Sequence, residues 1–556
     1  MNKITGLLRK LSTEHLWCLS VMVGIFIFLN THPIRPHDFW WHIAVGREIV
    51  ATGQIPTVDT FSFTMNGTPY PSYQAFWLME VALYGVYSLG GPALVVFVHS
   101  LVITSAYAIL LWLSRRISGS WRSAAFATLF AAALGLNDWN VRPQAVAFPL
   151  AALFLLAIHA YRRKPQRRWL IVFPLGMMLW VNCHGTFPIG LLLIGLWLAD
   201  EAWNILKVQL LESKWPALRP LIAPTAALLA ATVACLANPR GTGILAYVSG
   251  ISANPVIQNL VPEWVAPSLG SLAGKLFLGG LLLASAILAL SPRRPSAFQL
   301  LSFLAFAGLG LKTSRGSIWF GIVMAPTLAE HLAQIGKAVK RESEEARERV
   351  SEKARKRESE KARKRESEKA RKRGGEQATI LHSPFSTLHS PLPTHHSPLS
   401  IQNLLNAILA GLLLVGAGLS LPWFKDLWPM SPSKAGLISA ETPVAATDFL
   451  LQEHLPGPVF HNMAYGSYLI WAAQPEYPVF VDSRIELYSP EIWFDYLKIS
   501  AGQGDWEERL QMYEIHILML SRQEQPGLVQ AAIESPHWKR VYEDTTTLLL
   551  VQESRP

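Results

Sequence analysis

Long apolar stretches alternate with short polar loops along most of this chain. A helix needs about 20 residues to cross the hydrocarbon of a bilayer. Stretches that reach or approach this length cover residues 15–34, 92–113, 122–137, 142–161, 169–183, 186–203, 220–237, 273–291, 298–312, 316–336 and 401–421. The pattern predicts a mostly α-helical, polytopic membrane protein with about 11 transmembrane helices.

Charges in the loops predict the orientation of these helices, because Lys and Arg collect on the cytoplasmic side. Alternate loops carry clusters of cations: Arg115, Arg116 and Arg122; Arg162, Arg163, Lys164, Arg167 and Arg168; Lys207, Lys214 and Arg219; Arg293 and Arg294. The other loops hold isolated cations: Arg35, Arg47, Arg142, Arg240, Lys312 and Arg315. We therefore expect a protein of the bacterial cytoplasmic membrane, with its N-terminus inside and the chain after about residue 422 outside. No small-x-small cleavage site follows the first apolar stretch, so we expect it to be a retained helix.

The polar regions divide the chain into four parts. A membrane domain, 1–338, contains a long outer loop at 35–91. A low-complexity linker follows at 339–400 on the cytoplasmic side, then the last transmembrane helix at 401–421. Residues 440–556 have the composition of a globular domain, which the orientation places outside the membrane.

Both outer parts have predictable elements. The outer loop is expected to contain a helix at 40–50, a break at 53–56, a strand-like piece at 61–64, a hairpin turn at Asn66–Gly67 and a helix at 76–89 that ends at Gly90–Gly91. In the C-terminal part we expect strands at 458–460, 478–482, 515–520 and 546–551 and helices at 490–498 and 505–513. The second pattern predicts a small α/β domain.

The linker accounts for most of the net charge of +10. Residues 337–373 contain 17 Lys and Arg against 9 Asp and Glu, so the rest of the chain is nearly neutral and gives no sign of nucleic-acid binding. Glu–Lys pairs four residues apart in the repeat at 351–373 predict a solvated charged helix rather than contact with anionic lipid. The His-Ser-Pro repeats at 381–398 predict an unstructured segment. Three cysteines, Cys18, Cys183 and Cys235, do not make a disulfide framework.

One polar cluster lies just outside the first predicted span. Asp38 is followed by Phe39, Trp40, Trp41 and His42. A carboxylate among aromatic side chains suits a base that deprotonates a sugar acceptor, with the Trp rings to stack on the sugar and His42 one helical turn away to share the site. The alternative is an aromatic belt at the membrane boundary, with Asp38 capping the next helix. The residues alone leave both open.

The loop around this cluster resembles the first outer loop of the GT-C-fold membrane glycosyltransferases. The match runs from Asp38 through Gly53-Gln54-Ile55-Pro56, Asn66-Gly67-Thr68-Pro69-Tyr70 and Phe76-Trp77-Leu78 to Gly90-Gly91. Within that superfamily it is similar to the protein O-mannosyltransferase and aminoarabinose transferase branch. By resemblance, Asp38 takes the place of the catalytic Asp. Further motifs resemble a bacterial group of uncharacterised GT-C-like membrane proteins: Asp-x-x-Trp-His, Arg142-Pro143-Gln144, Asn182-x-His184-Gly185, Asn238-Pro239-x-Gly241 and Val479 to Arg484.

The loop departs from the family pattern at two points. Phe39 stands where the family has Glu after its catalytic Asp, and Ser72-Tyr73-Gln74-Ala75 stands where it has Glu-Lys-Pro-Pro. A second carboxylate would then have to be Asp59 or Glu80.

Other charged residues fall on the outer side by the same orientation. Arg142 is expected either to hold a lipid phosphate or to anchor a helix end at the interface. His184 is a ligand or base, or a structural histidine. Arg240 is a weaker phosphate candidate in a turn. Asp482 and Arg484 are expected to form a structural ion pair at the end of a strand.

These observations predict a membrane glycosyltransferase facing outward. It would move a sugar from a polyprenyl-phosphate donor, itself a membrane lipid, to a lipid, glycan or protein. The alternatives are a transporter or lipid-handling protein and a non-catalytic GT-C relative. The outer stretches carry no zinc-type spacing, P-loop or nucleophile elbow, and a divalent cation stays an open cofactor.

Overall fold

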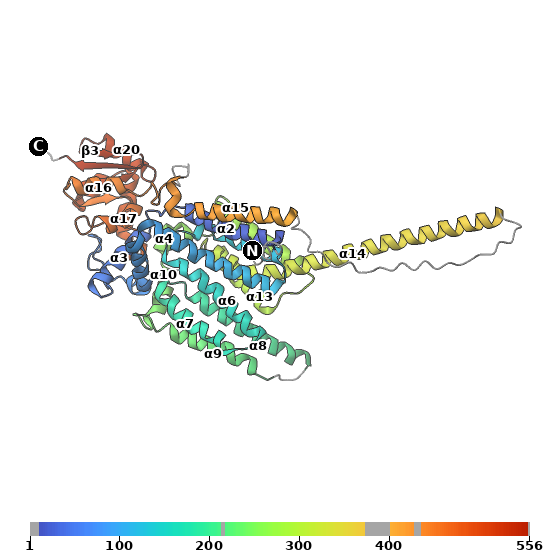
Figure 1. The fold of residues 1–556 in the computed structure, drawn as a ribbon. Coiled ribbons are helices and arrows are strands. Elements are labelled where there is room, and N and C mark those ends of the chain that lie inside the picture. The colour runs from blue at the N-terminus through green and yellow to red at the C-terminus, as the bar shows by residue number, and fades with distance from the viewer. Residues whose placement is uncertain (1–10, 213–216, 373–400, 428–434, 554–556) are drawn as a thin grey trace.

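The structure, a computed structural model, describes residues 11–212, 217–372, 401–427 and 435–553. An elongated helical bundle carries a small α/β domain at one end, and a single long helix leaves the other end (Figure 1). The long bundle helices are α2 (Thr13–Thr31), α4 (Ser72–Ser118), α5 (Trp121–Gly135), α6 (Ala147–Arg163), α7 (Arg167–Cys183), α8 (Pro188–Glu212), α9 (Arg219–Ala234), α12 (Leu272–Leu290), α13 (Ala297–Lys312), α14 (Gly316–Lys372) and α15 (Ile401–Leu419). Shorter helices in the loops are α3 (Phe39–Thr52), η1 (Leu136–Asp138), η2 (Pro143–Val146), α10 (Gly243–Ala253), α11 (Pro255–Leu260), η3 (Pro262–Trp264) and η4 (Pro422–Leu427).

The helices confirm the mostly α, polytopic membrane architecture. Among the described residues, 7 helices are long and apolar enough to cross a membrane, and they lie in α2, α4, the η2–α6 segment, α8, α12, α14 and α15. The remaining predicted stretches also form helices, although α5, α7, α9 and α13 are shorter. The number of spans therefore stays a prediction. Cys18, Cys183 and Cys235 are buried and free, in agreement with the absence of a disulfide framework.

Helix α4 breaks where the sequence predicted the end of an outer-loop helix. Gly90 and Gly91 have non-helical backbone angles, and Gly91 has a φ of 59°, a conformation that favours glycine. Pro92 then begins the second part, as proline often does at a first helical turn. The break separates an outer-loop helix before Gly90 from the membrane-spanning helix after it.

The predicted helix–hairpin–helix order of the outer loop is present. Helix α3 ends at Gly53, whose φ is 69°, and Val58 pairs antiparallel with Pro69 around the turn at Gly67. A Cβ at Gly46 would lie 2.2 Å from the Glu80 backbone oxygen, so only glycine allows α3 this close to α4. The two helices are thus held as one unit at the outer end of the bundle.

The C-terminal part is an α/β domain, as predicted. Its strands, β1 (Val459–His461), β2 (Ile517–Ser521), β3 (Trp538–Glu543) and β4 (Thr547–Gln552), form one sheet in the order β1-β2-β4-β3. β1 runs parallel to β2, while β4 is antiparallel to both β2 and β3. Its helices are α16 (Val444–Gln452), α17 (Met463–Ala472), η5 (Ile485–Leu487), α18 (Pro490–Ala501), α19 (Trp506–Met512) and α20 (Pro526–Glu534). The sequence pattern missed α16, α17, α20 and β3.

The segment at 478–482 was wrongly predicted to be a strand of this domain. Val479 to Asp482 are buried and Pro478 is partly exposed, but Val479 pairs with Ser62 of the outer loop, and its amide donates to the Phe61 oxygen at 2.9 Å. An apolar run predicts burial and extension, and it does not say which strand will be the partner. The segment therefore joins the C-terminal domain to the outer loop instead of extending the sheet.

The outer loop and the C-terminal domain also share a hydrophobic core. Trp41, Phe61 and Tyr73 of the loop belong to the same cluster of buried side chains as Phe460 and Phe480 of the domain. A second, larger cluster fills the helical bundle. The C-terminal domain therefore packs directly on the outer loop.

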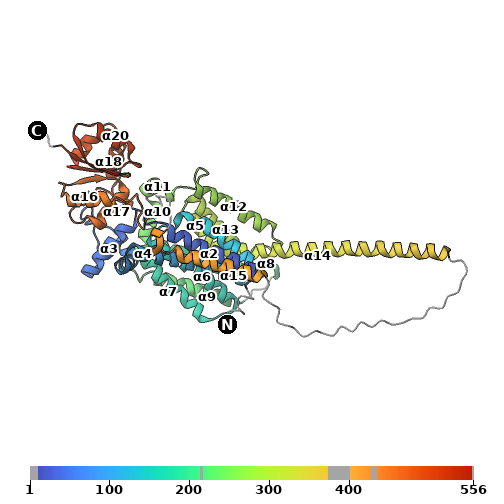
Figure 2. The ribbon, with the colours of Figure 1, turned by 45° about the horizontal axis from the view of Figure 1, so that its top comes forward.

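The C-terminal domain and the charged end of α14 lie at opposite ends of the bundle in both views (Figures 1 and 2). The charged helix predicted at 351–373 is present, as a continuation of the membrane helix: α14 has 57 residues, or about 85 Å at 1.5 Å per residue. The His-Ser-Pro repeats at 381–398 lie outside the described residues. The two polar parts are thus separated by the length of the bundle.

The loop charges predict which side is cytoplasmic, and this prediction can be measured. Reporter fusions after residues 165 and 345 should give cytoplasmic signals, and a fusion after residue 556 should give an external one. An external signal at residue 345 would reverse the scheme and remove the outward-facing site described below.

Removal of residues 340–398 should leave folding and activity nearly unchanged. The side chains described between 351 and 365 are all exposed, so this part of α14 contributes no core. Membrane insertion, measured by fractionation, and the thermal midpoint of the purified variant should match those of the full chain. Failure to insert would mean that the linker has a structural role.

Candidate active site

Four charged side chains from four different loops meet at the outer end of the bundle. Asp38 precedes α3, Arg142 precedes η2, Glu263 lies in η3 and Arg315 directly precedes α14. The Arg142 Nε atom is 3.0 Å from Asp38 Oδ2, and its Nη1 donates to both Glu263 oxygens at 2.6 and 2.8 Å. Arg315 Nε donates to Glu263 Oε2 at 2.6 Å. We call this alternating series Asp38–Arg142–Glu263–Arg315 the charge row.

The charge row is ionised yet reachable from solvent. The Asp38 and Arg142 side chains are 22% and 18% exposed. Burial alone would raise the pKa of Asp38, but Arg142 and a hydrogen bond from Ser483 lower it to about 2. Burial likewise opposes ionisation of Glu263, and Arg315 and Arg142 hold its pKa below the usual value. Both carboxylates are therefore charged at neutral pH.

Asp138, at the end of η1, lies in the field of the charge row. Burial and the Glu263 charge raise its pKa to about 8, against the opposing effect of Arg315 and Arg142. Its Oδ2 atom is buried and has no hydrogen-bond partner among the described residues. A carboxyl group in this state is largely protonated at neutral pH and can exchange a proton near it.

Two of the predicted histidines border the charge row. His42 Nδ1 lies 3.2 Å from Glu80 Oε1, and the His42 ring is 5.9 Å from Phe76, which stacks on His184 at 5.4 Å. Burial lowers the pKa of each histidine to about 3; Arg142 adds to the effect at His42 and Arg315 at His184. Both rings are thus neutral at physiological pH.

The two tryptophans after Asp38 belong to the protein core. Trp40 is fully buried, its ring 4.9 Å from that of Tyr468, and its indole nitrogen donates to the Arg35 oxygen at 3.1 Å. Trp41 is 4% exposed and packs against Tyr73 and other rings of the outer loop. Neither ring offers a free face on which a sugar could stack, so both support the loop.

The two predicted second carboxylates are also buried. Asp59 accepts hydrogen bonds from Arg484 and from the Ser62 hydroxyl, and its side chain is not exposed at all. Glu80 is likewise fully buried, against His42. Of the carboxylates named from the sequence, the structure brings only Asp38 into the charge row. The second carboxylate beside Arg142 is Glu263.

Arg240 lies farther along the same face. Its Nη1 donates to Gln74 Oε1 at 3.2 Å, and its guanidinium lies 5.5 Å from the Tyr247 ring. The neighbouring amide of Asn238 donates to Val181 and to the Asn182 side chain. The Asn-containing motifs thus tie two membrane helices together, and Arg240 stands at their edge.

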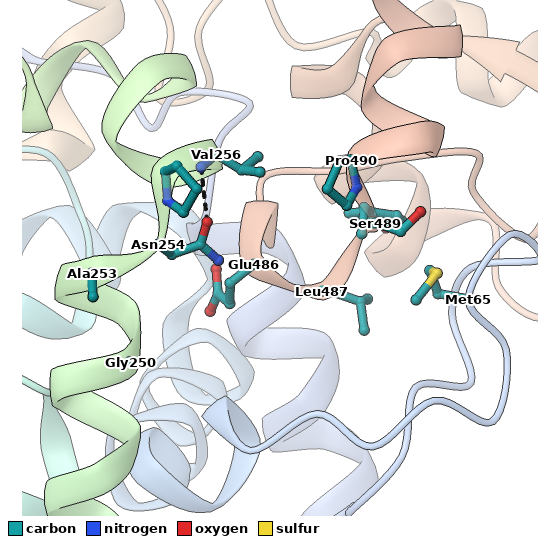
Figure 3. Close-up of a pocket in the computed structure, with 11 residues that line it drawn as sticks. Met65, Gly250, Ala253, Asn254, Val256, Glu486, Leu487, Ser489 and Pro490 are labelled. Atoms are coloured by element: carbon teal, nitrogen blue, oxygen red, sulfur yellow. Dashed lines mark hydrogen bonds between the residues drawn. The ribbon is translucent and has the colours of Figure 1, made fainter.

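A pocket opens where the C-terminal domain meets the outer loop and the α10–α11 turn (Figure 3). Its volume is about 470 Å³, and apolar side chains such as Met65, Val256 and Leu487 line much of it. Glu486 is the single charged residue in the lining. Tyr70 and Ser72 both donate to Glu486 Oε1 at 2.8 Å, which orients the carboxylate.

Metal ligands were left open by the sequence. Across the ranges that the structure describes, no group of three or more His, Cys, Asp and Glu side chains is placed to hold a metal ion.

Sequence reasoning did not find Glu263, Asp138, Arg315 or Ser483 as site residues. The sequence hints at Glu263 and Asp138 only weakly, because each is an acidic residue in a predicted outer loop. Arg315 counted only as an isolated outer cation. Their convergence depends on how α5, α13 and α14 pack, which the linear pattern does not contain.

No protein-family model and no curated protein matches the chain. Several solved structures are similar to it, and two of them are described here. The apo oligosaccharyltransferase of Archaeoglobus fulgidus is 11% identical, covers 97% of this chain and 74% of its own, and has a TM-score of 0.47. ArnT from Cupriavidus metallidurans, bound to undecaprenyl phosphate, is 15% identical, covers 96% of this chain and 97% of its own, and has a TM-score of 0.44.

Proposed function

We propose that this protein is an integral-membrane glycosyltransferase whose reaction centre is the charge row at the outer end of the bundle. It transfers a sugar from a polyprenyl-phosphate donor to an acceptor at the outer face. One observation carries the proposal: an ionised, partly exposed carboxylate, Asp38, lies 3.0 Å from the guanidinium of Arg142 at the boundary between membrane helices and outer domain. A base and a phosphate-binding cation are the two groups that this reaction needs.

Asp38 is proposed as the base. Its charge is kept at neutral pH by Arg142, and its exposed edge leaves room for an acceptor. When the donor phosphate binds Arg142, it competes with Asp38 for the same guanidinium. The loss of that partner raises the pKa of Asp38 and makes the carboxylate a stronger base once the donor is in place.

Arg142 and Arg315 are proposed to stabilise the departing phosphate. Guanidinium groups bind phosphate through paired hydrogen bonds, and Glu263 holds both of them in one orientation. Arg240 stands outside the charge row and is proposed to guide the lipid phosphate toward it.

Asp38, Arg142 and Arg315 are enough for the proposed transfer step, because the first accepts the proton and the other two face the leaving phosphate. The acceptor oxygen or nitrogen loses its proton to Asp38 and attacks the anomeric carbon of the sugar. A new bond forms there as the bond between that carbon and the phosphate oxygen breaks. The electron pair leaves with the polyprenyl phosphate, whose charge faces Arg142 and Arg315.

The neutral ring of His184, which stacks on Phe76, is proposed to border the sugar site. His42 is as buried as Trp41 and is assigned, with its partner Glu80, to support of the outer loop. Asp59, Glu80, Trp40 and Trp41 are assigned to support of the outer loop, because each is buried.

The proposal is tested by the lipids of cells that lack the protein. Mass spectrometry of their membrane lipids and envelope glycans should show one glycosylated product missing and one polyprenyl-phosphate sugar accumulated. Restoring the gene should reverse both changes. Unchanged glycans together with a lipid that has moved between membrane leaflets would favour a transporter or lipid-handling protein instead.

A further inference from the structure

The pocket beside Glu486 has walls from three separate parts of the chain (Figure 3). Met65 belongs to the outer loop, the residues between Gly250 and Val256 belong to α10 and α11, and those between Glu486 and Pro490 belong to the C-terminal domain. The lining residues lie outside the 7 helices that can cross a membrane, and none of them belongs to the charge row. The pocket is therefore a space apart from the proposed reaction centre.

Glu486 has one carboxylate oxygen fixed by hydroxyl groups and one that is not. Its Oε1 atom accepts hydrogen bonds from Tyr70 and Ser72 at 2.8 Å, and the Ser72 hydroxyl is itself bonded to the hydroxyl of Tyr247 in α10. Among the described residues, no Lys or Arg side chain pairs with Glu486, and the pocket lining contains no cation. A carboxylate in mostly apolar surroundings is stabilised by a cation, and here the protein itself supplies none.

The helix ends at the pocket also favour a cation over an anion. Gly250 and Ala253 line it from the last turn of α10, and the C-terminal end of a helix carries partial negative charge. The N-terminus of α18 lies at the pocket as well, but the Ser489 hydroxyl already accepts from the Ile492 amide there. Pro490, the first residue of α18, has no amide hydrogen to donate to an anion.

The size and the other walls of the pocket suit a small molecule. Its volume of about 470 Å³ falls within the range of about 300–1,000 Å³ that is typical of small-molecule sites. Met65, Val256 and Leu487 offer apolar surface to the carbon part of a ligand. An ammonium group brings three N–H donors and a positive charge to the Glu486 carboxylate, whereas a hydroxyl group brings a donor without the charge.

We propose that this pocket binds a water-soluble organic amine, with the ammonium group on Glu486 and the carbon part against the apolar walls. The three walls meet only while the C-terminal domain is packed on the outer loop and on the α10–α11 turn. A ligand stabilises the state to which it binds, so the amine also strengthens the attachment of the domain. The site goes beyond the transfer reaction and does not require Asp38 to be the base.

The charge preference is tested with 2-phenylethylamine and with 2-phenylethanol, its uncharged counterpart of similar shape. In calorimetric titrations of the full-length protein in phosphatidylcholine nanodiscs, corrected with empty discs, the amine should bind about tenfold or more tightly than the alcohol. Glu486→Gln keeps an oxygen for Tyr70 and Ser72, removes the charge and should abolish this preference. The control Glu534→Gln, at an exposed position of α20, should keep it. Equal wild-type affinity for both probes, or an unchanged preference in Glu486→Gln, would overturn the proposal.

The place of binding is tested by filling the pocket. A Cβ at Gly250 would meet no atom within 4 Å, so Gly250→Leu occupies part of the pocket without a clash of its Cβ. This variant should bind 2-phenylethylamine about tenfold or more weakly with an unchanged thermal midpoint. The control Gly279→Leu, at an equally open position of α12, should bind as the wild type does. Undiminished binding by Gly250→Leu would overturn the site, and displacement of the probe by phosphatidylethanolamine in the discs would overturn the assignment to a water-soluble ligand.

Discussion

Replacing Asp38 by Asn should lower the rate of sugar transfer by about a hundredfold or more while the protein still inserts and folds. Asparagine keeps the size of the side chain, and its amide oxygen can still accept a hydrogen bond. It cannot take a proton from the acceptor, and assistance by a general base typically contributes about 10²–10⁴-fold. The rate of product formation in isolated membranes, divided by the amount of protein, measures the effect.

Glu80→Gln is the matched control for this substitution. Glu80 is also a carboxylate of the outer loop, but it is fully buried against His42 and away from Arg142. Its amide variant should therefore keep much more activity than Asp38→Asn. The Asp38 side chain makes no capping hydrogen bond to α3, so near-normal transfer by Asp38→Asn would mean that the carboxylate only holds Arg142 in place.

Replacing Arg484 by Met should release the C-terminal domain from the outer loop. The guanidinium neutralises two buried carboxylates, Asp59 and Asp482, which would then face each other without a counter-charge. Removal of one partner from a buried ion pair costs about 3–5 kcal/mol. We expect a clear fall in the thermal midpoint of the purified protein and cleavage by added protease between the membrane domain and residue 440.

Arg522→Met provides the comparison on the same domain. Arg522 pairs with Glu543, and these side chains are 43% and 33% exposed. Exposed ion pairs contribute about 0–1 kcal/mol, so this variant should melt close to the wild type. Equal behaviour of Arg484→Met and Arg522→Met would show that the buried ion pairs of Arg484 with Asp59 and Asp482 do not hold the domain.

The membrane helices could be predicted from the sequence because each needs one property only, a long apolar run. The break at Gly90–Gly91 and the turn at Gly67 were predictable for a similar reason, since glycine favours these local backbone conformations. The partner of a strand cannot be predicted in this way, because it depends on residues far away in the sequence. The run from Val479 to Val481 indicates burial equally well beside β1 or beside Phe61, and only the packing of α17 decides between them.

The sequence could identify individual residues of the site, but it could not show which residues from distant loops meet there. Asp38 and Arg142 could be named from their place at the outer ends of spans. Glu263 reaches Arg142 from a segment more than a hundred residues away, along a path set by η3. Asp59 and Glu80 looked equivalent as carboxylates in the sequence, and burial is what separates them from Asp38.

The central claim is tested most directly with purified protein in liposomes that contain lipids extracted from cells lacking it. The account predicts that the wild-type protein converts one polyprenyl-phosphate sugar to free polyprenyl phosphate while one acceptor gains the mass of that sugar, and that Asp38→Asn does neither. A wild-type protein that leaves every donor and acceptor mass unchanged in these liposomes, while the same lipids support another membrane glycosyltransferase, would contradict it.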